Sequence, residues 1–436
     1  MGCVLFAAIF SCAVHAQRVE EALDIESVWA GHPVGFCLLT KPPNQYVAYF
    51  DANRQLTVAS RTLDSRIWSF TRLDEHVQWD SHNGIVMAID SAGNLHLAGN
   101  MHVAPLKYFR SEQPGDATTL TRVPSMIGAN EDRVTYPEFL RGPGEKLVFT
   151  YRDGSSGGGN QIYNAFDAVS QRWNRLMDTP LTDGERQRNA YFVGPVTGPD
   201  GYYHVCWVWR DTPDCTTNHD LSYARSKDLV HWERSDGTPY QLPITLATSE
   251  IVDPIPVNGG VINGCTQIGF DAARSAVVAY HKFDANGNTQ IYNARVENGK
   301  WQVRQLTTWE YRWEFRGPGS ITSEIHVRPV QVESDGSLTQ AWSHVKHGSQ
   351  RWRLNPATLT PEERVPDEPS PLPGTLRNVV SSFPGVGVRI KRDSGQSDST
   401  NHYYIIRWET LGHNRDRPRD PPWPDPSMLC VYRIAK

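Results

Sequence analysis

Short runs of alternating apolar and polar residues recur along the chain, and each run is bounded by turn-forming residues. Leu56–Ser60, Leu95–Ala98 and Lys146–Tyr151 are three such runs, with Gly, Asn, Asp and Pro between them. A period of two is typical of strands, because successive side chains of a strand point to opposite faces of its sheet. No amphipathic helical stretch exceeds about three turns. The pattern therefore predicts an all-β fold.

One short strand-like segment recurs, usually followed by a turn and a tryptophan. The copies are Gln161–Ala165 with Trp173, Gln290–Ala294 with Trp301, Leu221–Ser226 with Trp232, Leu56–Ser60 with Trp68, and Lys107–Ser111 without a tryptophan. Their spacing of about 50 to 70 residues suits a four-stranded sheet, and such repeats indicate propeller blades or a solenoid. We predict a seven-bladed β-propeller in residues 17–436, with a broken pair of sandwiches as the alternative.

The two ends of the chain have distinct compositions. Residues 3–14 are apolar and lead into Val14-His15-Ala16, which predicts a secretory signal peptide in residues 1–16 and a secreted or periplasmic protein. A buried first strand or helix is the alternative interpretation. Residues 360–373 form a Pro- and acid-rich connector. Beyond it, we expect residues 374–436 to form the closing blade, with an exposed Pro- and Arg-rich loop at 413–426 and a last strand that pairs with the first blade.

Overall composition excludes several classes of function. The 436 residues carry 43 Lys and Arg against 48 Asp and Glu, a net charge of -5, which disfavours a nucleic-acid binder that uses a basic face. After the N-terminus there is no apolar run long enough to span a membrane. Hydrophobic residues make up 39% of the chain, enough for a sizeable core. We expect a monomer.

Five polar residues lie near the starts or ends of the predicted strands of successive blades: His82, His102, Tyr136, Arg152 and Tyr191. Loops at one rim of a propeller converge, so these side chains can meet in one pocket. The set suits β-elimination from a uronic acid, which requires a cation at the carboxylate, a base beside the ring and an acid at the leaving oxygen.

Four of these residues also have a purely structural interpretation. His82 can cap a turn, and Tyr136 and Tyr191 can pack in the core. Arg152 can pair with Asp153 or Glu138, while residues 155–159 (SSGGG) are expected to form a loose loop. Paired Asp or Glu residues, which glycoside hydrolysis requires, do not stand out.

Several motifs resemble the polysaccharide lyases among BNR-repeat propeller proteins, most of all the seven-bladed ulvan lyases. They are Asp90-Ser-Ala-Gly-Asn-Leu-His96, Gly99-Asn-Met-His102, Thr135-Tyr-Pro-Glu-Phe139, Phe149-Thr-Tyr-Arg-Asp153 and Trp207-Val-Trp-Arg-Asp-Thr-Pro213, and the resemblance covers most of residues 30–350. It implies an acidic polysaccharide as substrate, cleaved by elimination at a uronate linked to rhamnose, with no cofactor required for catalysis. Related propellers cleave rhamnose–glucuronate linkages in plant gums, so the resemblance does not identify which polysaccharide is the substrate.

The resemblance also assigns roles to the five residues. It places the family's two histidines on His82 and His102, its catalytic tyrosine on Tyr136, its carboxylate-neutralising arginine on Arg152 and a further pocket tyrosine on Tyr191. We expect Tyr136 or His82 as base, Tyr136 also as acid, and Arg152 with His102 at the carboxylate.

A second motif indicates a structural metal. His204, Cys206, Cys215 and His219 form H-x-C-x8-C-x3-H, which predicts a closed tetrahedral zinc site, and the resemblance likewise implies a structural zinc. The alternative is a Cys206–Cys215 disulfide with two unrelated histidines. Five cysteines follow residue 16, and an odd number excludes a complete disulfide framework within one chain.

Two other functions compete with a lyase. A sialidase-like hydrolase should carry several Ser-x-Asp-x-Gly-x-x-Trp turns, and only Ser226–Trp232 comes close, without the glycine. A non-catalytic carbohydrate-binding propeller could stack sugars on Trp207, Trp209, Trp309 or Trp313, although such side chains more often fill gaps between blades.

Overall fold

The computed structural model describes residues 17–367, 372–395 and 401–436, so the predicted signal peptide in residues 1–16 lies outside the described residues. Within these ranges the chain forms strands and short 3-10 turns, with no α-helix, which confirms the predicted all-β class. None of the helical segments described has the length and apolar character of a membrane span. The 3-10 turns are η1 (Ala117–Thr119), η2 (Pro143–Glu145), η3 (Cys215–Thr217), η4 (Leu246–Thr248) and η5 (Gly374–Arg377).

The described strands group into seven sheets, and the first four in chain order carry the residues of interest. The β2–β5 sheet contains β2 (Cys37–Lys41), β3 (Asn44–Phe50), β4 (Gln55–Thr62) and β5 (Ser69–His76). The β6–β10 sheet contains β6 (Ile85–Ile89), β7 (Leu95–Gly99), β9 (Tyr108–Ser111) and β10 (Leu120–Val123). The β11–β14 sheet contains β11 (Val134–Arg141), β12 (Leu147–Ser155), β13 (Gly158–Asp167) and β14 (Arg172–Arg175), with β8 (His102–Ala104) added beside β11. The β15–β19 sheet contains β15 (Asn189–Thr197), β16 (Tyr203–Arg210), β17 (Asn218–Ser226), β18 (Trp232–Glu233) and β19 (Glu250–Asp253).

Three further sheets complete the arrangement. The β20–β23 sheet contains β20 (Gln267–Phe270), β21 (Ala276–Phe283), β22 (Thr289–Glu297) and β23 (Lys300–Gln305). The β24–β28 sheet contains β24 (Ile325–Val327), β25 (Gln331–Val332), β26 (Leu338–His344), β27 (Gly348–Leu354) and β28 (Pro361–Val365). The last sheet has the order β1-β31-β30-β29 and contains β1 (Val19–Val28), β29 (Val386–Arg392), β30 (His402–Leu411) and β31 (Ser427–Ala435).

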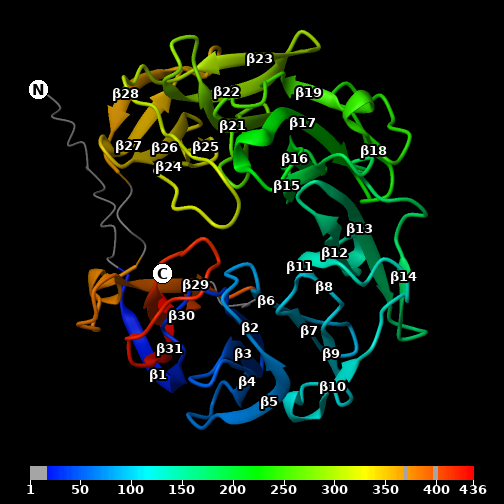
Figure 1. Cartoon of the computed structure of the whole chain (residues 1–436), viewed down its shortest axis with the longest axis vertical. Coiled ribbons are helices and arrows are strands. Elements are labelled where there is room, and N and C mark those ends of the chain that lie inside the picture. Colours follow the sequence, from blue (N-terminus) through cyan, green and yellow to red (C-terminus); the bar gives the residue numbers. More distant parts are fainter. Residues whose placement is uncertain (1–16, 368–371, 396–400) are drawn as a thin grey trace, which may run out of the picture.

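The last sheet joins the two ends of the chain. β1 pairs antiparallel with β31, from Val19 opposite Ile434 to Val28 opposite Ser427. Figure 1 shows the seven sheets side by side around a common centre, with the first and last strands together in one of them. The chain therefore begins and ends in the same sheet, and the sheet of the N-terminal residues lies next to β2–β5.

The repeated sequence segment corresponds to one strand of each sheet. Its copies lie in β4, β9, β13, β17 and β22. Counted from β2, β6, β11, β15 and β20, each of these is the third strand along its sheet, with every neighbouring strand antiparallel. The tryptophan that follows packs toward the preceding sheet. The indole N–H of Trp173 donates to the Tyr108 hydroxyl at 3.1 Å, and Trp301 donates to the Glu250 carboxylate at 3.0 Å. The repeated segment and its tryptophan therefore belong to the contacts that hold consecutive sheets together.

The core lies between neighbouring sheets. One apolar cluster joins Ala98 and Tyr108 of the β6–β10 sheet to Phe149 and Trp173 of the next sheet. Another joins Val148 and Tyr163 to residues of the β15–β19 sheet, including Trp232. Burial of these aromatic and aliphatic side chains fixes each sheet against the next one, so the loops at the sheet ends are held in place.

Trp173 offers a test of this packing. We expect Trp173→Ala to lower the free energy of unfolding by about 3–5 kcal/mol, because it removes a buried aromatic ring and leaves a cavity between two sheets. Denaturant unfolding followed by circular dichroism measures the change. The control Val169→Ala alters a side chain that is 97% exposed and should shift stability by no more than about 0.5 kcal/mol. Equal effects of the two substitutions would contradict the packing role.

Candidate active site

Four of the five predicted polar residues line one cavity of about 340 Å³, called here the site cavity. They are His82, His102, Tyr136 and Tyr191. The loop before β6 supplies His82, β8 supplies His102, and β11 and β15 supply the two tyrosines. Three consecutive sheets and the loops between them therefore contribute to one pocket.

The register of β8 explains why His102 reaches its neighbours. β8 leaves its own sheet and pairs with β11, which places His102 opposite Thr135. Arg152 of β12 is opposite Thr135 on the other side of β11. The ring centres of His102 and Tyr136 are 5.9 Å apart, and those of His82 and Tyr136 are 5.7 Å apart. The strand pairing at Thr135 therefore brings His102, Tyr136 and Arg152 close together.

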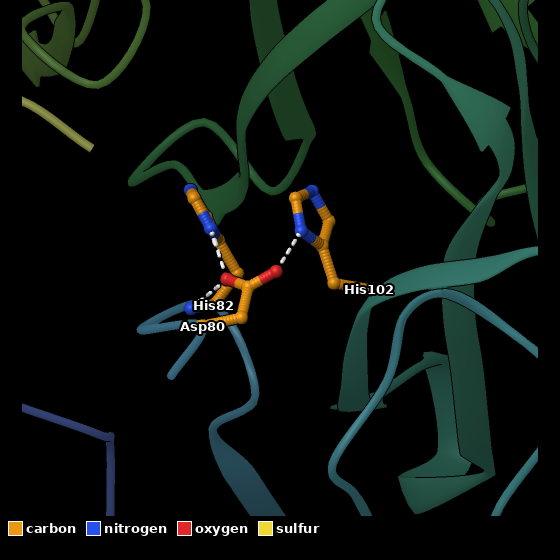
Figure 2. A group of neighbouring side chains, drawn as sticks. All are labelled: Asp80, His82 and His102. Atoms are coloured by element: carbon orange, nitrogen blue, oxygen red, sulfur yellow. Dashed lines mark hydrogen bonds and ion pairs between the residues drawn. The ribbon is translucent and has the colours of Figure 1, made fainter. Parts of the chain in front are cut away.

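Asp80 holds both histidines, as Figure 2 shows. One carboxylate oxygen lies 2.7 Å from Nδ1 of His82, and the other lies 2.5 Å from Nδ1 of His102. Burial alone would raise the pKa of Asp80, but the hydrogen bonds from the two imidazoles outweigh it and lower the pKa. An ionised Asp80 that accepts Nδ1–H from both rings leaves Nε2 of each ring as the proton acceptor.

Asp80, His82 and His102 also form the one group of three or more potential metal ligands found among residues 17–367, 372–395 and 401–436. The carboxylate oxygens are already at hydrogen-bond distance from both Nδ1 atoms. This arrangement is typical of a carboxylate that orients imidazoles, so we interpret the group as a hydrogen-bonded triad.

Tyr136 occupies a strained position. Its backbone φ is 52°, in the left-handed region that non-glycine residues rarely adopt, and the β11–β12 register shifts between Thr135 and Glu138. Tyr136, which was expected near the start or end of a strand, lies at a bulge within β11. Bulges and strained backbone redirect side chains and are common at functional sites. Here the distortion directs the ring into the site cavity. Burial, with the nearby Tyr191, raises the pKa of Tyr136.

Arg152 lies beside the cavity and does not line it. The residue is 2% exposed, and its guanidinium carbon is 4.8 Å from the Tyr136 ring centre and 5.3 Å from that of Tyr191. Its Nε donates to the Gly154 carbonyl at 3.1 Å, but neither terminal nitrogen has a hydrogen bond of ordinary geometry. In the described part of the chain it pairs with neither Asp153 nor Glu138, the two alternatives that the sequence allowed. A buried cation without a counter-charge is costly unless an anion binds nearby.

The segment predicted to be a loose loop is a tight hairpin, which corrects that expectation. β12 runs to Ser155 and β13 begins at Gly158, with Ser155 paired to Gly158. A side chain at Gly159 would place its Cβ 3.0 Å from Cγ of Arg152. Glycine is therefore needed here so that the backbone can approach the arginine stem.

Tyr191 is surrounded by positive charge. The guanidinium of Arg210 lies 5.4 Å from its ring centre, close to the distance at which Arg152 lies. Its hydroxyl is 2.7 Å from the Ser156 hydroxyl at the tip of the β12–β13 hairpin. Burial alone would raise the pKa of Tyr191, but the two arginines and the Ser156 hydrogen bond lower it. The two tyrosines of the cavity are thus shifted in opposite directions.

Sequence reasoning missed Asp80, Ser156, Arg210 and Asp416. An Arg-Asp pair occurs near the end of β12 (Arg152-Asp153) and again at the end of β16 (Arg210-Asp211). This repetition in the sequence could have pointed to Arg210. Arg210 lines the site cavity and donates to the Thr212 carbonyl and the Asn263 side chain. Asp80 is two residues before His82. No signal near His82 in sequence pointed to Asp416.

Asp416 comes from the loop that was predicted to be exposed. Its carboxylate accepts hydrogen bonds from the Ser81 amide (3.0 Å) and hydroxyl (2.6 Å), and from the Ser320 amide (2.7 Å) and hydroxyl (3.1 Å). It also lies 3.5 Å from Nδ1 of His82. Ser320 lines the site cavity. Parts of loop 413–426 are exposed, as expected, but Asp416 is half-buried and connects both sides of the cavity.

The predicted zinc site is not formed, because the strand register separates its four residues. In the β16–β17 hairpin His204 pairs with Arg225 and Cys206 with Tyr223, whereas His219 pairs with Trp209. His219 is thus five residues further along the hairpin than His204, roughly 16 Å at the usual rise of a strand. The four residues therefore do not fit a tetrahedral zinc ion.

The two histidines have other partners. His204 contacts the Tyr223 hydroxyl at 2.6 Å and Asp200 at 3.0 Å, and His219 contacts Asp220 at 2.8 Å and Asp211 at 3.1 Å. Cys206 and Cys215 are both free and buried, so the alternative disulfide is not formed either. Cys215 lines the site cavity instead.

A sequence model of the BNR repeat-containing family matches residues 44–309. The chain belongs to this family. A comparison with curated proteins found no match. The match spans the second strand of the β2–β5 sheet through β23 and so includes the five residues discussed above.

Among solved structures, this BNR-repeat protein is similar to polysaccharide lyase Uly1, with 13% sequence identity, a TM-score of 0.61 and coverage of 96% of this chain and 99% of that one. It is also similar to a PL25 ulvan lyase bound to -[GlcA(1-4)Rha3S]-, with 13% identity, a TM-score of 0.59 and coverage of 96% of each chain. At this identity the likeness shows the fold. The predicted resemblance to BNR-repeat lyases is confirmed at the level of family and fold.

The opposite shifts of the two tyrosines predict an ultraviolet titration. Tyr191 should ionise at a lower pH than an ordinary tyrosine, because the lowered pKa favours its phenolate, and Tyr136 should ionise at a higher pH. Difference absorbance of tyrosinate against pH measures this. Tyr191→Phe should remove the earliest ionisation, and Tyr136→Phe should leave it in place. An unchanged first step in Tyr191→Phe would contradict the assignment.

The Asp416 contacts predict faster amide exchange after substitution. In Asp416→Asn the amides of Ser81 and Ser320 lose a charged acceptor, so their hydrogen exchange should accelerate about fivefold or more. Exchange followed by mass spectrometry or NMR gives the rates. Asp420→Asn, an exposed residue of the same loop, is the control and should leave both amides unchanged. Equal protection in the two variants would exclude the connection.

Proposed function

We propose that this BNR-repeat protein is an exported polysaccharide lyase, built as a seven-bladed propeller, that cleaves rhamnose–uronate linkages by β-elimination. The observation that carries the proposal is the buried charge of Arg152, which has no carboxylate partner in the described residues and lies behind two tyrosines of a cavity that also holds two histidines. A uronate carboxylate bound in the cavity would supply the missing negative charge. The seven sheets around one centre support the propeller.

The reaction begins at the carbon beside the carboxylate. A base takes the proton from that carbon, its electron pair forms the new double bond, and the bond to the glycosidic oxygen breaks. The leaving oxygen receives a proton from an acid, and the product keeps a 4,5-unsaturated uronate. The carbon acid is weak until positive charge stabilises the carboxylate, whose negative charge grows in the transition state.

Arg152 and Arg210 supply that positive charge. Arg210 lines the cavity, whereas Arg152 acts from behind the tyrosine rings. Because Arg152 does not line the cavity, it acts on the carboxylate through its charge and not through a direct hydrogen bond. Charge buried in a low-dielectric region acts over longer distances than charge in water.

His82 and Tyr136 suit the two proton transfers. Because Asp80 accepts the Nδ1 proton of His82, Nε2 is free to act as the base. The raised pKa of Tyr136 keeps its phenol protonated, which suits the acid that serves the leaving oxygen. His102, held by the other oxygen of Asp80, lies beside both and can donate to the carboxylate when protonated. Tyr191, whose pKa the charges of Arg152 and Arg210 lower despite its burial, is a second candidate base in the same cavity.

Incubation with a rhamnose–glucuronate polysaccharide tests the proposal. We expect the ultraviolet absorbance of an unsaturated uronate to rise, and to rise equally after treatment with a chelator, because these roles need no metal. Arg152→Ala and Tyr136→Phe should each lower the rate by on the order of a hundredfold. The control Arg274→Ala changes an exposed arginine of the β20–β21 turn and should keep the parent rate.

The other outcomes identify the competing functions. New reducing ends without the absorbance change would indicate a hydrolase, and binding without any cleavage would indicate a carbohydrate-binding protein. Near-normal turnover in Arg152→Ala would remove that residue from the mechanism. The pH dependence of the rate in His82→Gln and Tyr191→Phe separates the two candidate bases, since the base is the residue whose loss removes the rise of the rate with pH.

A further inference from the structure

Three tryptophans from separate parts of the chain meet around the guanidinium of Arg54. Its central carbon lies 4.1 Å from the ring centre of Trp29, 4.5 Å from that of Trp79 and 5.6 Å from that of Trp423. The three indoles also contact one another, with ring centres 5.4 to 5.8 Å apart. An indole face attracts a cation, so the guanidinium holds several rings at once. These four residues are called here the tryptophan cluster.

The indoles are the partners that the structure gives to this guanidinium. Within residues 17–367, 372–395 and 401–436 no carboxylate pairs with Arg54, and burial alone lowers its pKa. Aromatic faces partly replace the water that a half-buried guanidinium loses. The contribution of the Arg54 side chain therefore lies in its contacts with the three rings.

The tryptophan cluster is attached to the segment that leads into Asp80. Arg54 lies in the turn between β3 and β4, and its backbone carbonyl accepts a hydrogen bond from the Val77 amide at 3.0 Å. Trp79 follows two residues later and directly precedes Asp80. Both the backbone and the side chain of Arg54 therefore hold the segment before the carboxylate that orients the two imidazoles of the site.

The tryptophan cluster is also attached to the loop that carries Asp416. Trp423 belongs to this loop, and its indole N–H donates to the Arg419 carbonyl at 3.0 Å. The Arg419 guanidinium in turn donates to the carbonyls of Gly412 at 2.8 Å and His413 at 3.3 Å. The loop is thus bonded across its own length, so a contact at Trp423 restrains the position of Asp416.

A buried histidine shows that the tryptophan cluster adjoins both carboxylates of the site. The ring centre of His32 lies 5.9 Å from that of Trp79, and the residue is 2% exposed. Burial lowers the pKa of His32 to about 4, while the charges of Asp416 and Asp80 act to raise it. The two carboxylates therefore act on an imidazole that packs against the cluster.

We propose that Arg54 is a positioning residue, which holds two segments of the chain together through the indoles of the tryptophan cluster. One segment carries Asp80 and the other carries Asp416, and their carboxylates lie 2.7 and 3.5 Å from Nδ1 of His82. A shift of either segment would turn this ring and displace its Nε2, the proposed base. The effect on geometry is independent of activity, whereas the consequence for turnover rests on the proposed function.

Steady-state kinetics on a rhamnose–glucuronate polysaccharide measure the consequence for turnover. Arg54→Gln should lower kcat about five- to tenfold with KM changed by less than about twofold, because Arg54 does not line the site cavity but orients the base. Arg54→Lys keeps a cation that indole faces attract and should recover most of kcat. The control Arg234→Gln removes a guanidinium that lies 4.9 Å from the Tyr240 ring in another sheet, and it should keep the wild-type values.

A double-mutant cycle tests whether the tryptophan cluster acts as one unit. Trp423→Ala, at a residue that is 39% exposed, should also lower kcat, by about threefold. If Arg54 acts through Trp423, the double variant should lose less than the product of the two single losses. Losses that multiply, or a wild-type kcat in Arg54→Gln, overturn the proposal.

Amide exchange distinguishes this proposal from the proposed function. Arg54→Gln should accelerate hydrogen exchange about threefold or more at the amides of Ser81 and Ser320, which donate to Asp416, and Arg234→Gln should leave both rates unchanged. Faster exchange in a chain that forms no unsaturated uronate supports the positioning role and overturns the proposed function. If the wild-type chain forms the product while Arg54→Gln changes neither exchange nor kcat, the positioning role alone fails.

Discussion

The antiparallel pairing of β1 with β31 is the constraint on which the candidate site depends. Because this pairing places the C-terminal strands beside the β2–β5 sheet, the loop between β30 and β31 lies against the turn that holds His82. Asp416 then reaches Ser81 and Ser320, residues that are far from it in sequence. The pairing of the two ends therefore also fixes, through Asp416, the His82 turn and the Ser320 segment that border the pocket.

The pocket has a region of negative charge at Asp80 and a region of positive charge at Arg152 and Arg210. On one side, Asp80 gathers two imidazoles through one carboxylate and fixes which nitrogen of each ring can accept a proton. On the other side, Arg152 and Arg210 flank Tyr191 and lower its pKa, while burial raises that of Tyr136. Groups with proton affinities shifted in opposite directions are what an acid–base reaction at one carbon requires.

The sequence pattern was sufficient to predict those features of the fold that are set by interactions between residues close in sequence or by a repeated packing arrangement. The period-two alternation predicted the strands, and the repeated segment with its tryptophan identified the third strand of successive sheets, because each sheet repeats the same packing against its neighbour. The sequence pattern gave wrong predictions for features that depend on how neighbouring strands are paired. The H-x-C-x8-C-x3-H spacing suggested a metal site, yet the β16–β17 pairing places His219 opposite Trp209 and away from His204. The glycines at 157–159 suggested a loose loop, although the segment is a tight hairpin in which Gly159 lies against Arg152.

The sequence by itself predicted the all-β class and the sheet repeat, because residue type and spacing carry that information. Together with the family resemblance it also predicted the five candidate residues His82, His102, Tyr136, Arg152 and Tyr191. Only the tertiary structure decided that Arg152 lies behind the tyrosines, that Arg210 joins it and that Asp416 touches the His82 turn. These contacts join different sheets or chain ends, and their distances depend on how whole sheets pack around the centre. No local pattern in a single chain encodes such distances.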